Sequence, residues 1–201
     1  MKKSKQKTTT VIVIMFAVVI AIVIGFWAIL EQGRNKVEED KMIHSKNEEV
    51  NTLLNKDLNI DYPSTPREVL KMYSRLQSCV YNQDLSDKDL SAIVGQMRML
   101  FDDELVAANS LEQQLEDLKK EIKEYQKAKR TISNYVIDKE SSTTEKKLEG
   151  KEYATLEVSY LIQENRGYNK TYEQFILRKD EKDKWKILGW ELVRSEDEKQ
   201  E

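Results

Sequence analysis

The residue types able to perform chemistry are few in this chain of 201 residues, which holds one cysteine, Cys79, and one histidine, His44. A single thiol cannot form an intramolecular disulfide or complete a thiolate zinc site. A single imidazole excludes histidine-rich metal sites, and His44 lies in a charged segment where we expect it to be solvated. The six glycines stand singly, so no glycine-rich phosphate loop is present. The sequence therefore predicts no metal and no cofactor.

Carboxylates are abundant, with 36 acidic residues beside nine tyrosines. A carboxyl group in an apolar cavity has a raised pKa and can exchange protons near neutral pH. Glu157 falls on the polar face of its predicted strand, where we expect solvation. Glu173 shares its parity with the apolar Phe175, but it lies near the start of its strand, and we expect it to be exposed as well. Because no motif singles out a catalytic residue, we predict that the protein is not an enzyme.

Trp185 and Trp190 are the candidate site residues, either for interaction or for the core. They stand five positions apart on the last predicted strand, and an odd spacing places side chains on opposite faces of a regular strand. One indole should then fill the core. The other should lie on the opposite face, where tryptophan is a common anchor for a protein partner. The alternative is that the domain's own helices and loops cover both indoles.

The elements that position these residues begin with a membrane segment. Residues 11–30 are apolar except for Gly25, and twenty residues of helix span about 30 Å, the thickness of the hydrocarbon core of a bilayer. Phe26 and Trp27 stand where a signal-peptide cleavage site needs small residues, so we predict an uncleaved, single-pass anchor.

The flanks of this segment predict its orientation. Residues 1–10 carry four lysines and no acid, which favours a cytoplasmic N-terminus and places residues 31–201 outside the cell. When those four lysines are set aside, 29 of the 33 basic residues remain, against 36 acidic ones. An acidic exported part has no electrostatic attraction for nucleic acid, so we expect the membrane and other envelope proteins as partners, and we leave self-association open.

Three regions follow the anchor in the predicted organisation. Residues 31–60 are highly charged, and we predict a stalk there. Residues 61–193 hold enough apolar residues for one core. Residues 194–201 contain no apolar residue and are predicted to be a disordered tail.

The first half of the domain is predicted to be helical. Thr65-Pro66-Arg67-Glu68 has the residues of a capping box and opens a helix to about Tyr81. A second cap at Ser86 opens the next helix, and a short helical piece covers about residues 104–108. The helix over about residues 111–129 carries apolar residues at alternating spacings of four and three. This seam either packs on the domain's own sheet, which we favour, or forms a coiled coil.

The second half changes to a period of two. We predict strands over residues 131–138, 151–164, 168–179 and 184–193, and a loop over residues 140–150. The last three strands are joined by tight turns, which is typical of an antiparallel meander. Helices followed by such a sheet indicate the α+β class, with an N-terminal transmembrane helix, a stalk, and helices packed on a curved antiparallel sheet.

This order of elements, together with the closing run Lys184-Trp185-Lys186-Ile187-Leu188-Gly189-Trp190, resembles the nuclear-transport-factor-like cone fold, also called cystatin-like or SnoaL-like. In that superfamily a curved sheet wraps a long helix. Residues 62–69, preceded by the anchor, are similar to an uncharacterised membrane-anchored family of anaerobic Gram-positive bacteria. The superfamily includes enzymes, binders and scaffolds, so the resemblance implies the fold and not the function.

The residues expected to point inward decide between two functions. Leu156, Tyr160 and Phe175 are bulky and suggest a filled core. We therefore predict a membrane-anchored, extracytoplasmic protein-interaction or scaffold domain. The alternative is a domain that binds or senses a small ligand in the interior of the cone.

Overall fold

The computed structural model describes residues 48–139, 143–164 and 167–195. The predicted basic tail over residues 1–10, the anchor over residues 11–30, most of the predicted stalk and residues 196–201 lie outside these ranges. Among the described residues, no helix is long and apolar enough to cross a membrane. All described residues except Glu48 belong to one compact unit, which begins at Glu49.

The helices of this unit are α2 (Pro66–Asn82), α3 (Asp87–Met99), α4 (Asp103–Ala108) and α5 (Leu111–Ala128), preceded by a short helical segment over residues 48–54. Each of the four begins at a polar cap. Thr65 Oγ1 accepts a hydrogen bond from Glu68 N at 3.2 Å, and Ser86 Oγ accepts one from Asp89 N at 3.1 Å. Both predicted caps are confirmed.

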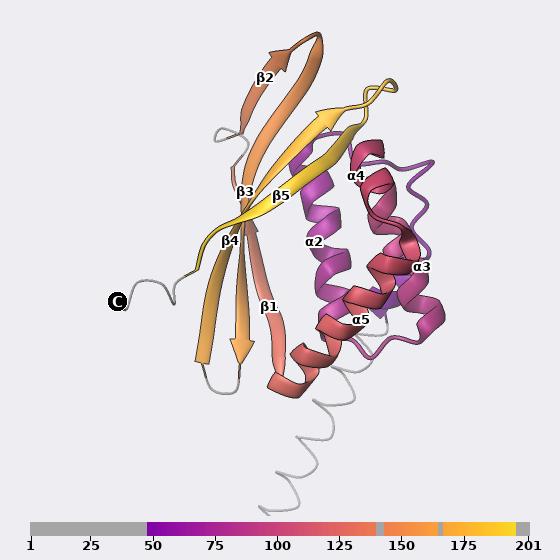
Figure 1. Cartoon of the computed structure of the whole chain (residues 1–201), viewed down its shortest axis with the longest axis vertical. Helices are drawn as coiled ribbons and strands as arrows, with labels where there is room; N and C mark the ends of the chain where they lie inside the picture. The colour runs from indigo at the N-terminus through magenta and orange to yellow at the C-terminus, as the bar shows by residue number, and fades with distance from the viewer. Residues whose placement is uncertain (1–47, 140–142, 165–166, 196–201) are drawn as a thin grey trace, which may run out of the picture. The chain divides into compact units, whose positions relative to one another are not determined.

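The strands are β1 (Arg130–Ile137), β2 (Thr144–Leu148), β3 (Lys151–Glu164), β4 (Gly167–Lys179) and β5 (Trp185–Ser195). They form one antiparallel sheet in the order β1-β3-β4-β5, and β2 pairs with the start of β3 (Figure 1). The α+β class is therefore confirmed. β2 falls in the predicted loop over residues 140–150, and the prediction missed it because all five of its side chains are exposed and show no apolar alternation.

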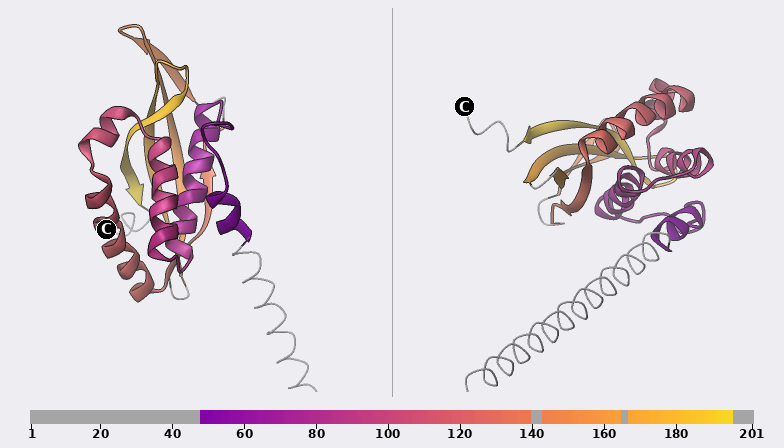
Figure 2. Two further views of the ribbon diagram at one scale, coloured as in Figure 1. Left: turned by 90° about the vertical axis from the view of Figure 1, so that its right-hand side faces the viewer. Right: turned by 90° about the horizontal axis from the view of Figure 1, so that it is seen from below.

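The helices lie on one side of the sheet (Figure 2). We call the sheet face toward α2 the inner face. It carries Leu156, Tyr160 and Phe175, all buried as expected, and the Tyr160 hydroxyl lies 3.0 Å from Ser74 Oγ of α2. α2 packs on β1, β3 and β5, so it is the central helix of the core.

The domain begins earlier than the predicted start at Asp61. Leu53 and Leu58, both in the predicted stalk, are buried in the core. The Tyr62 hydroxyl donates a hydrogen bond of 2.8 Å to the carbonyl oxygen of Trp185, so this segment is also tied to β5. Two well-spaced leucines among charged residues give too weak a pattern to reveal such packing from the sequence.

An extra residue in β5 changes the direction of its side chains. Leu177 pairs with Ile187 and Ile176 pairs with Gly189, so Leu188 is a β-bulge. Residues that pair directly across an antiparallel ladder project from the same face, and Lys179 pairs with Trp185 while Phe175 pairs with Trp190. Trp185 and Trp190 therefore both project from the inner face. The expectation that they face opposite sides is wrong, because it assumes a regular strand.

Candidate functional site

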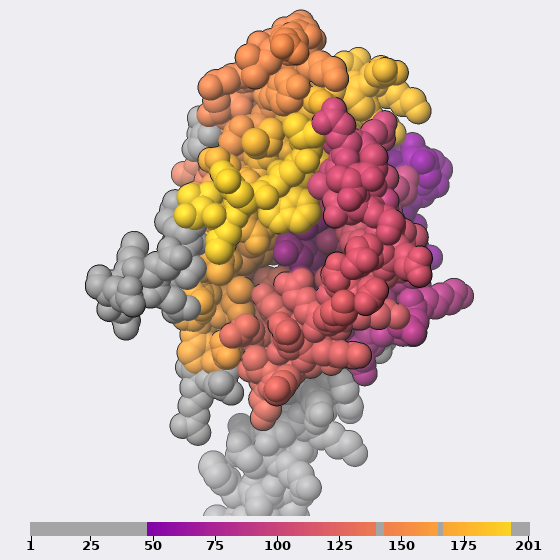
Figure 3. Space-filling view, viewed as in Figure 1, coloured from indigo at the N-terminus to yellow at the C-terminus, as the bar shows by residue number. Residues whose placement is uncertain are grey.

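A cavity of about 350 Å³ separates part of α5 from the inner face of the sheet. In the space-filling view, a hollow opens between the C-terminal half of β5, in yellow, and α5, in red (Figure 3). The lining comes from every helix from α2 to α5 and from β4 and β5: Tyr73, Gln77, Val80, Tyr81, Met97, Phe101, Leu105, Asn109, Gln113, Gln114, Asp117, Leu118, Glu121, Glu173 and Trp190.

One wall of the cavity is aromatic. The ring of Trp190 lies 5.7 Å from Tyr73 and 5.9 Å from Phe101, measured between centroids. Phe175 is fully buried behind it, and its ring stacks with the indole. Trp185 is 5% exposed and belongs to the core, whereas Trp190 remains 41% exposed because it borders the cavity. The bulge at Leu188 thus turns Trp190 from the outer face into this wall.

The cavity exists because α5 stands apart from the sheet. No residue of α5 is fully buried, and Leu115, Leu118 and Ile122 are only partly covered. The helix packs on β1 and α2, where the rings of Tyr81 and Tyr125 lie 4.5 Å apart. The prediction that its apolar seam packs within the domain agrees with these contacts, but the packing is incomplete.

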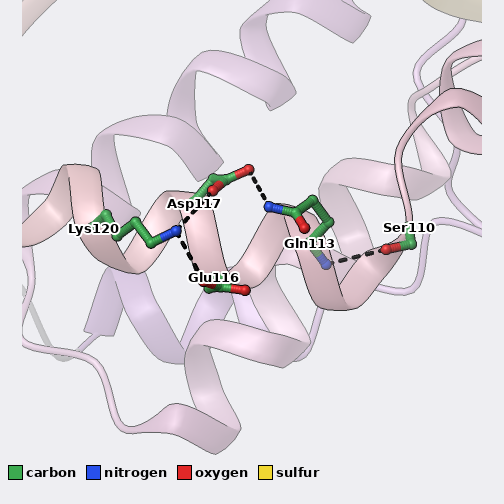
Figure 4. Close-up of polar contacts among 5 residues, drawn as sticks. All are labelled: Ser110, Gln113, Glu116, Asp117 and Lys120. Carbon is green, nitrogen blue, oxygen red and sulfur yellow. Dashed lines mark hydrogen bonds and ion pairs between the residues drawn. The ribbon is translucent and has the colours of Figure 1, made fainter.

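The start of α5 is held by Arg98 of α3, whose guanidinium donates to Gln114 Oε1 and to the carbonyl oxygen of Asn109, both at 2.8 Å. Polar contacts then run along the helix (Figure 4). Gln113 Nε2 donates to Asp117 Oδ2 at 2.8 Å, so these two lining side chains form a polar rim.

Glu173 of β4 places a carboxyl group inside the cavity. Burial, assisted by the charge of Glu121, raises the pKa of Glu173 to about 7. The expectation that Glu173 is exposed is wrong. Glu173 lies two positions before Phe175 on β4, so both side chains project from the inner face, and this spacing was the correct indication of burial. The helices extend far enough to cover the start of β4.

Two buried acceptors in the cavity lack a donor. Within the part of the chain that the structure describes, no group hydrogen-bonds to Glu173 Oε2 or to Gln77 Oε1. Buried polar atoms are normally paired, so these two oxygens can accept hydrogen bonds from a bound molecule. Burial and the neighbouring Glu121 also raise the pKa of the Tyr81 hydroxyl, which therefore stays protonated.

Sequence reasoning missed Gln77 and Glu121, although a signal for Gln77 exists. Tyr73, Gln77 and Tyr81 follow one another at a spacing of four on α2, which places an amide in the middle of an otherwise buried face. Glu121 has no comparable signal, because α5 is rich in acidic residues and most of them are solvated.

The arrangement can hold a molecule more readily than transform one. A single carboxyl group with a pKa near 7 could exchange a proton, but the cavity brings no nucleophile together with a base. The described residues contain no group of three or more His, Cys, Asp or Glu side chains that could hold a metal ion. Aromatic walls with a few convergent polar groups are typical of small-molecule sites.

Comparison with known proteins identifies a family whose description gives no function. No curated protein matches the sequence. A model of the family described as Domain of unknown function (DUF6715) matches residues 1–190, a range that includes every residue lining the cavity. Because the match covers nearly the whole chain, the protein belongs to the DUF6715 domain family.

Proposed function

We propose that the protein is a membrane-anchored, extracytoplasmic domain that binds or senses a small ligand. The cavity beside Trp190 is the observation that carries this proposal. Its volume of about 350 Å³ lies within the range of about 300–1,000 Å³ that is usual for small-molecule sites. Ligand binding thus takes precedence over the scaffold function, which rested on the expectation of a filled core.

The remaining parts of the proposal come from the sequence. The apolar run over residues 11–30 supports a single-pass anchor, and the lysines before it support a cytoplasmic N-terminus with the domain outside. Helices that pack on one face of an antiparallel sheet are compatible with the nuclear-transport-factor-like cone, which we propose as the fold family. We propose binding without catalysis, since the cavity pairs its carboxyl group with no nucleophile.

The test is binding of small aromatic probes to the full chain in phosphatidylcholine nanodiscs. We expect at least one of 2-phenylethylamine, 2-phenylethanol and 3-phenylpropanoate to raise the melting temperature of the domain, and Trp190→Ala to abolish the shift. Ile176→Ala is the matched control, because Ile176 is a comparably exposed apolar residue on the outer face of the same sheet. If none of the probes shifts the wild type, the proposal fails.

A protein-interaction function remains a second candidate, supported by exposed apolar residues near the end of β5. Leu192 is 61% exposed and the adjacent Val193 is also exposed. If this region contacts envelope proteins, Leu192→Ser with Val193→Ser should remove crosslinked species from intact membranes and leave the melting temperature unchanged. Unchanged crosslinking would remove this candidate.

A further inference from the structure

We infer that the cavity takes an organic cation, namely a protonated amine carried on an apolar body. This inference rests on the proposed ligand-binding function and specifies the chemical class of the ligand. It depends on the charge of the lining, on the two acceptors without donors, and on the aromatic wall.

The ionisable side chains of the lining favour positive charge. Asp117, Glu121 and Glu173 are acidic, and no lysine, arginine or histidine among the described residues lines the cavity. Arg98 lies close by and is not itself a lining residue; its guanidinium is engaged with the lining residues Gln114 and Asn109 and with the carbonyl oxygen of Val106. Asp117 is paired with Lys120 at 3.3 Å, so Glu121 and Glu173 are the acids that a ligand cation would gain from, whereas an anion would be repelled by them.

The hydrogen-bonding groups favour a donor. Glu173 Oε2 and Gln77 Oε1 are buried acceptors without a donor among the described residues. An ammonium group has three donors and no acceptor, so it suits a site whose unpaired groups are acceptors. A hydrogen bond between an ammonium and a carboxylate is also stronger than one between neutral groups.

The aromatic wall favours the same ligand. The ring centroid of Trp190 lies 5.7 Å from that of Tyr73 and 5.9 Å from that of Phe101. Indole is the best of the aromatic partners for a cation, and the apolar body of the ligand can pack on the same rings. An amine with an apolar body therefore matches the wall and the carboxyl group together.

Glu173 makes the binding pH-dependent. The groups around its carboxyl come from four elements, and none is basic: Glu121, Asp117 and Tyr125 of α5, Tyr73, Gln77 and Tyr81 of α2, Tyr160 of β3 and Trp190 of β5. With a pKa of about 7, Glu173 is mostly protonated at pH 6 and mostly ionised at pH 8. A ligand amine stays protonated over this range, so its affinity should rise about tenfold from pH 6 to pH 8.

The experiment is calorimetric titration of the full chain in phosphatidylcholine nanodiscs with three probes of similar shape. 2-Phenylethylamine is a cation at pH 8, 2-phenylethanol is neutral and 3-phenylpropanoate is an anion. We expect the amine to bind at least tenfold more tightly than the alcohol, and the anion to bind more weakly than either. Glu173→Gln should weaken the amine about tenfold, leave the alcohol within twofold and flatten the pH dependence.

Glu116→Gln is the matched control, because Glu116 lies on the same helix as Glu121 but pairs with Lys120 outside the cavity. It should change neither affinity. If the alcohol or the anion binds as tightly as the amine, or if Glu173→Gln leaves the preference intact, the cation inference fails while the ligand-binding function stands. If none of the three probes binds, both fail.

Discussion

The indole of Trp190 stacks on the ring of Phe175, with 5.7 Å between the ring centroids and 22° between the planes. The two residues pair directly across β4 and β5, so the ladder itself sets the position of the indole. Phe175 is fully buried and provides a rigid backing. Trp190 is thereby held as a wall of the cavity rather than as a free surface anchor.

The two tryptophans should differ in their contribution to stability. We expect Trp185→Ala to lower the free energy of unfolding by about 3–5 kcal/mol, because Trp185 is buried in the core. Trp190→Ala should cost about 1–2 kcal/mol, since the indole is partly exposed and loses mainly its ring contacts. Chemical denaturation followed by circular dichroism measures both, and equal costs would contradict the exposed position of Trp190.

Glu173 should destabilise the domain at alkaline pH. Its pKa is about 7 in the folded state against an ordinary value of 4.5, so the folded state holds a proton that the unfolded chain releases between these pH values. The free energy of unfolding therefore falls as pH rises from 4.5 to 7, and Glu173→Gln should remove this fall. We expect the variant to match the wild type at pH 4.5 and to be more stable by about 1–3 kcal/mol at pH 8. A variant less stable than the wild type at pH 8 would refute this reasoning.

Cys79 should react slowly in the folded protein. Its side chain is 4% exposed, and burial raises the pKa of the thiol to about 11. At pH 8 only about one thiol in a thousand is then ionised. Labelling by a polar maleimide should accelerate at least a hundredfold on denaturation. Equal rates in the two states would mean that this face of α2 is accessible.

The ion pair between Asp102 and Arg178 should be important for stability. Asp102 is buried, caps α4 and accepts a hydrogen bond of 3.0 Å from Arg178 Nε. Asp102→Asn removes the buried carboxylate and leaves the half-buried Arg178 guanidinium with Glu104 as its remaining ionic partner among the described residues, and we expect a cost of about 3–5 kcal/mol. The control is Glu152→Gln, which removes an exposed partner of Lys179 and should leave the melting temperature unchanged. Similar losses in both variants would contradict this prediction.

The membrane topology is testable in intact cells. If the N-terminus is cytoplasmic, an added protease should digest residues 31–201, while a tag fused to Met1 stays protected. Lysed cells provide the control, because the tag should then be digested as well. Protection of the C-terminal domain in intact cells would reverse the proposed orientation.

The elements with strong local signals were predictable from the sequence. The caps at Thr65 and Ser86 are correct, and the predicted strand over residues 151–164 coincides with β3. One detail of the first cap differs from a regular capping box. Glu68 accepts its main hydrogen bonds from the backbone and hydroxyl of Ser64, one residue before the N-cap. Local sequence therefore predicts where the helix begins but not every partner of the cap.

The site was less predictable, because it depends on tertiary packing. No single segment of the sequence determines how far α5 stands from the sheet, and the cavity depends on that distance. The bulge at Leu188 has no sequence signal either, since Ile187, Leu188 and Trp190 fit a regular strand equally well. This one residue reversed the predicted direction of Trp190 and so placed its indole in the cavity wall.

The bulge also has an evolutionary consequence. Leu188 is the unpaired residue, so loss of its single codon would restore regular alternation and leave Trp190 opposite Phe175 on the inner face. A substitution that straightens the strand at its present length would instead turn Trp190 to the outer face, because the retained residue then reverses the alternation. The cavity would lose its indole wall, and a lineage that binds small molecules could gain a surface that docks on proteins without any change in the helices.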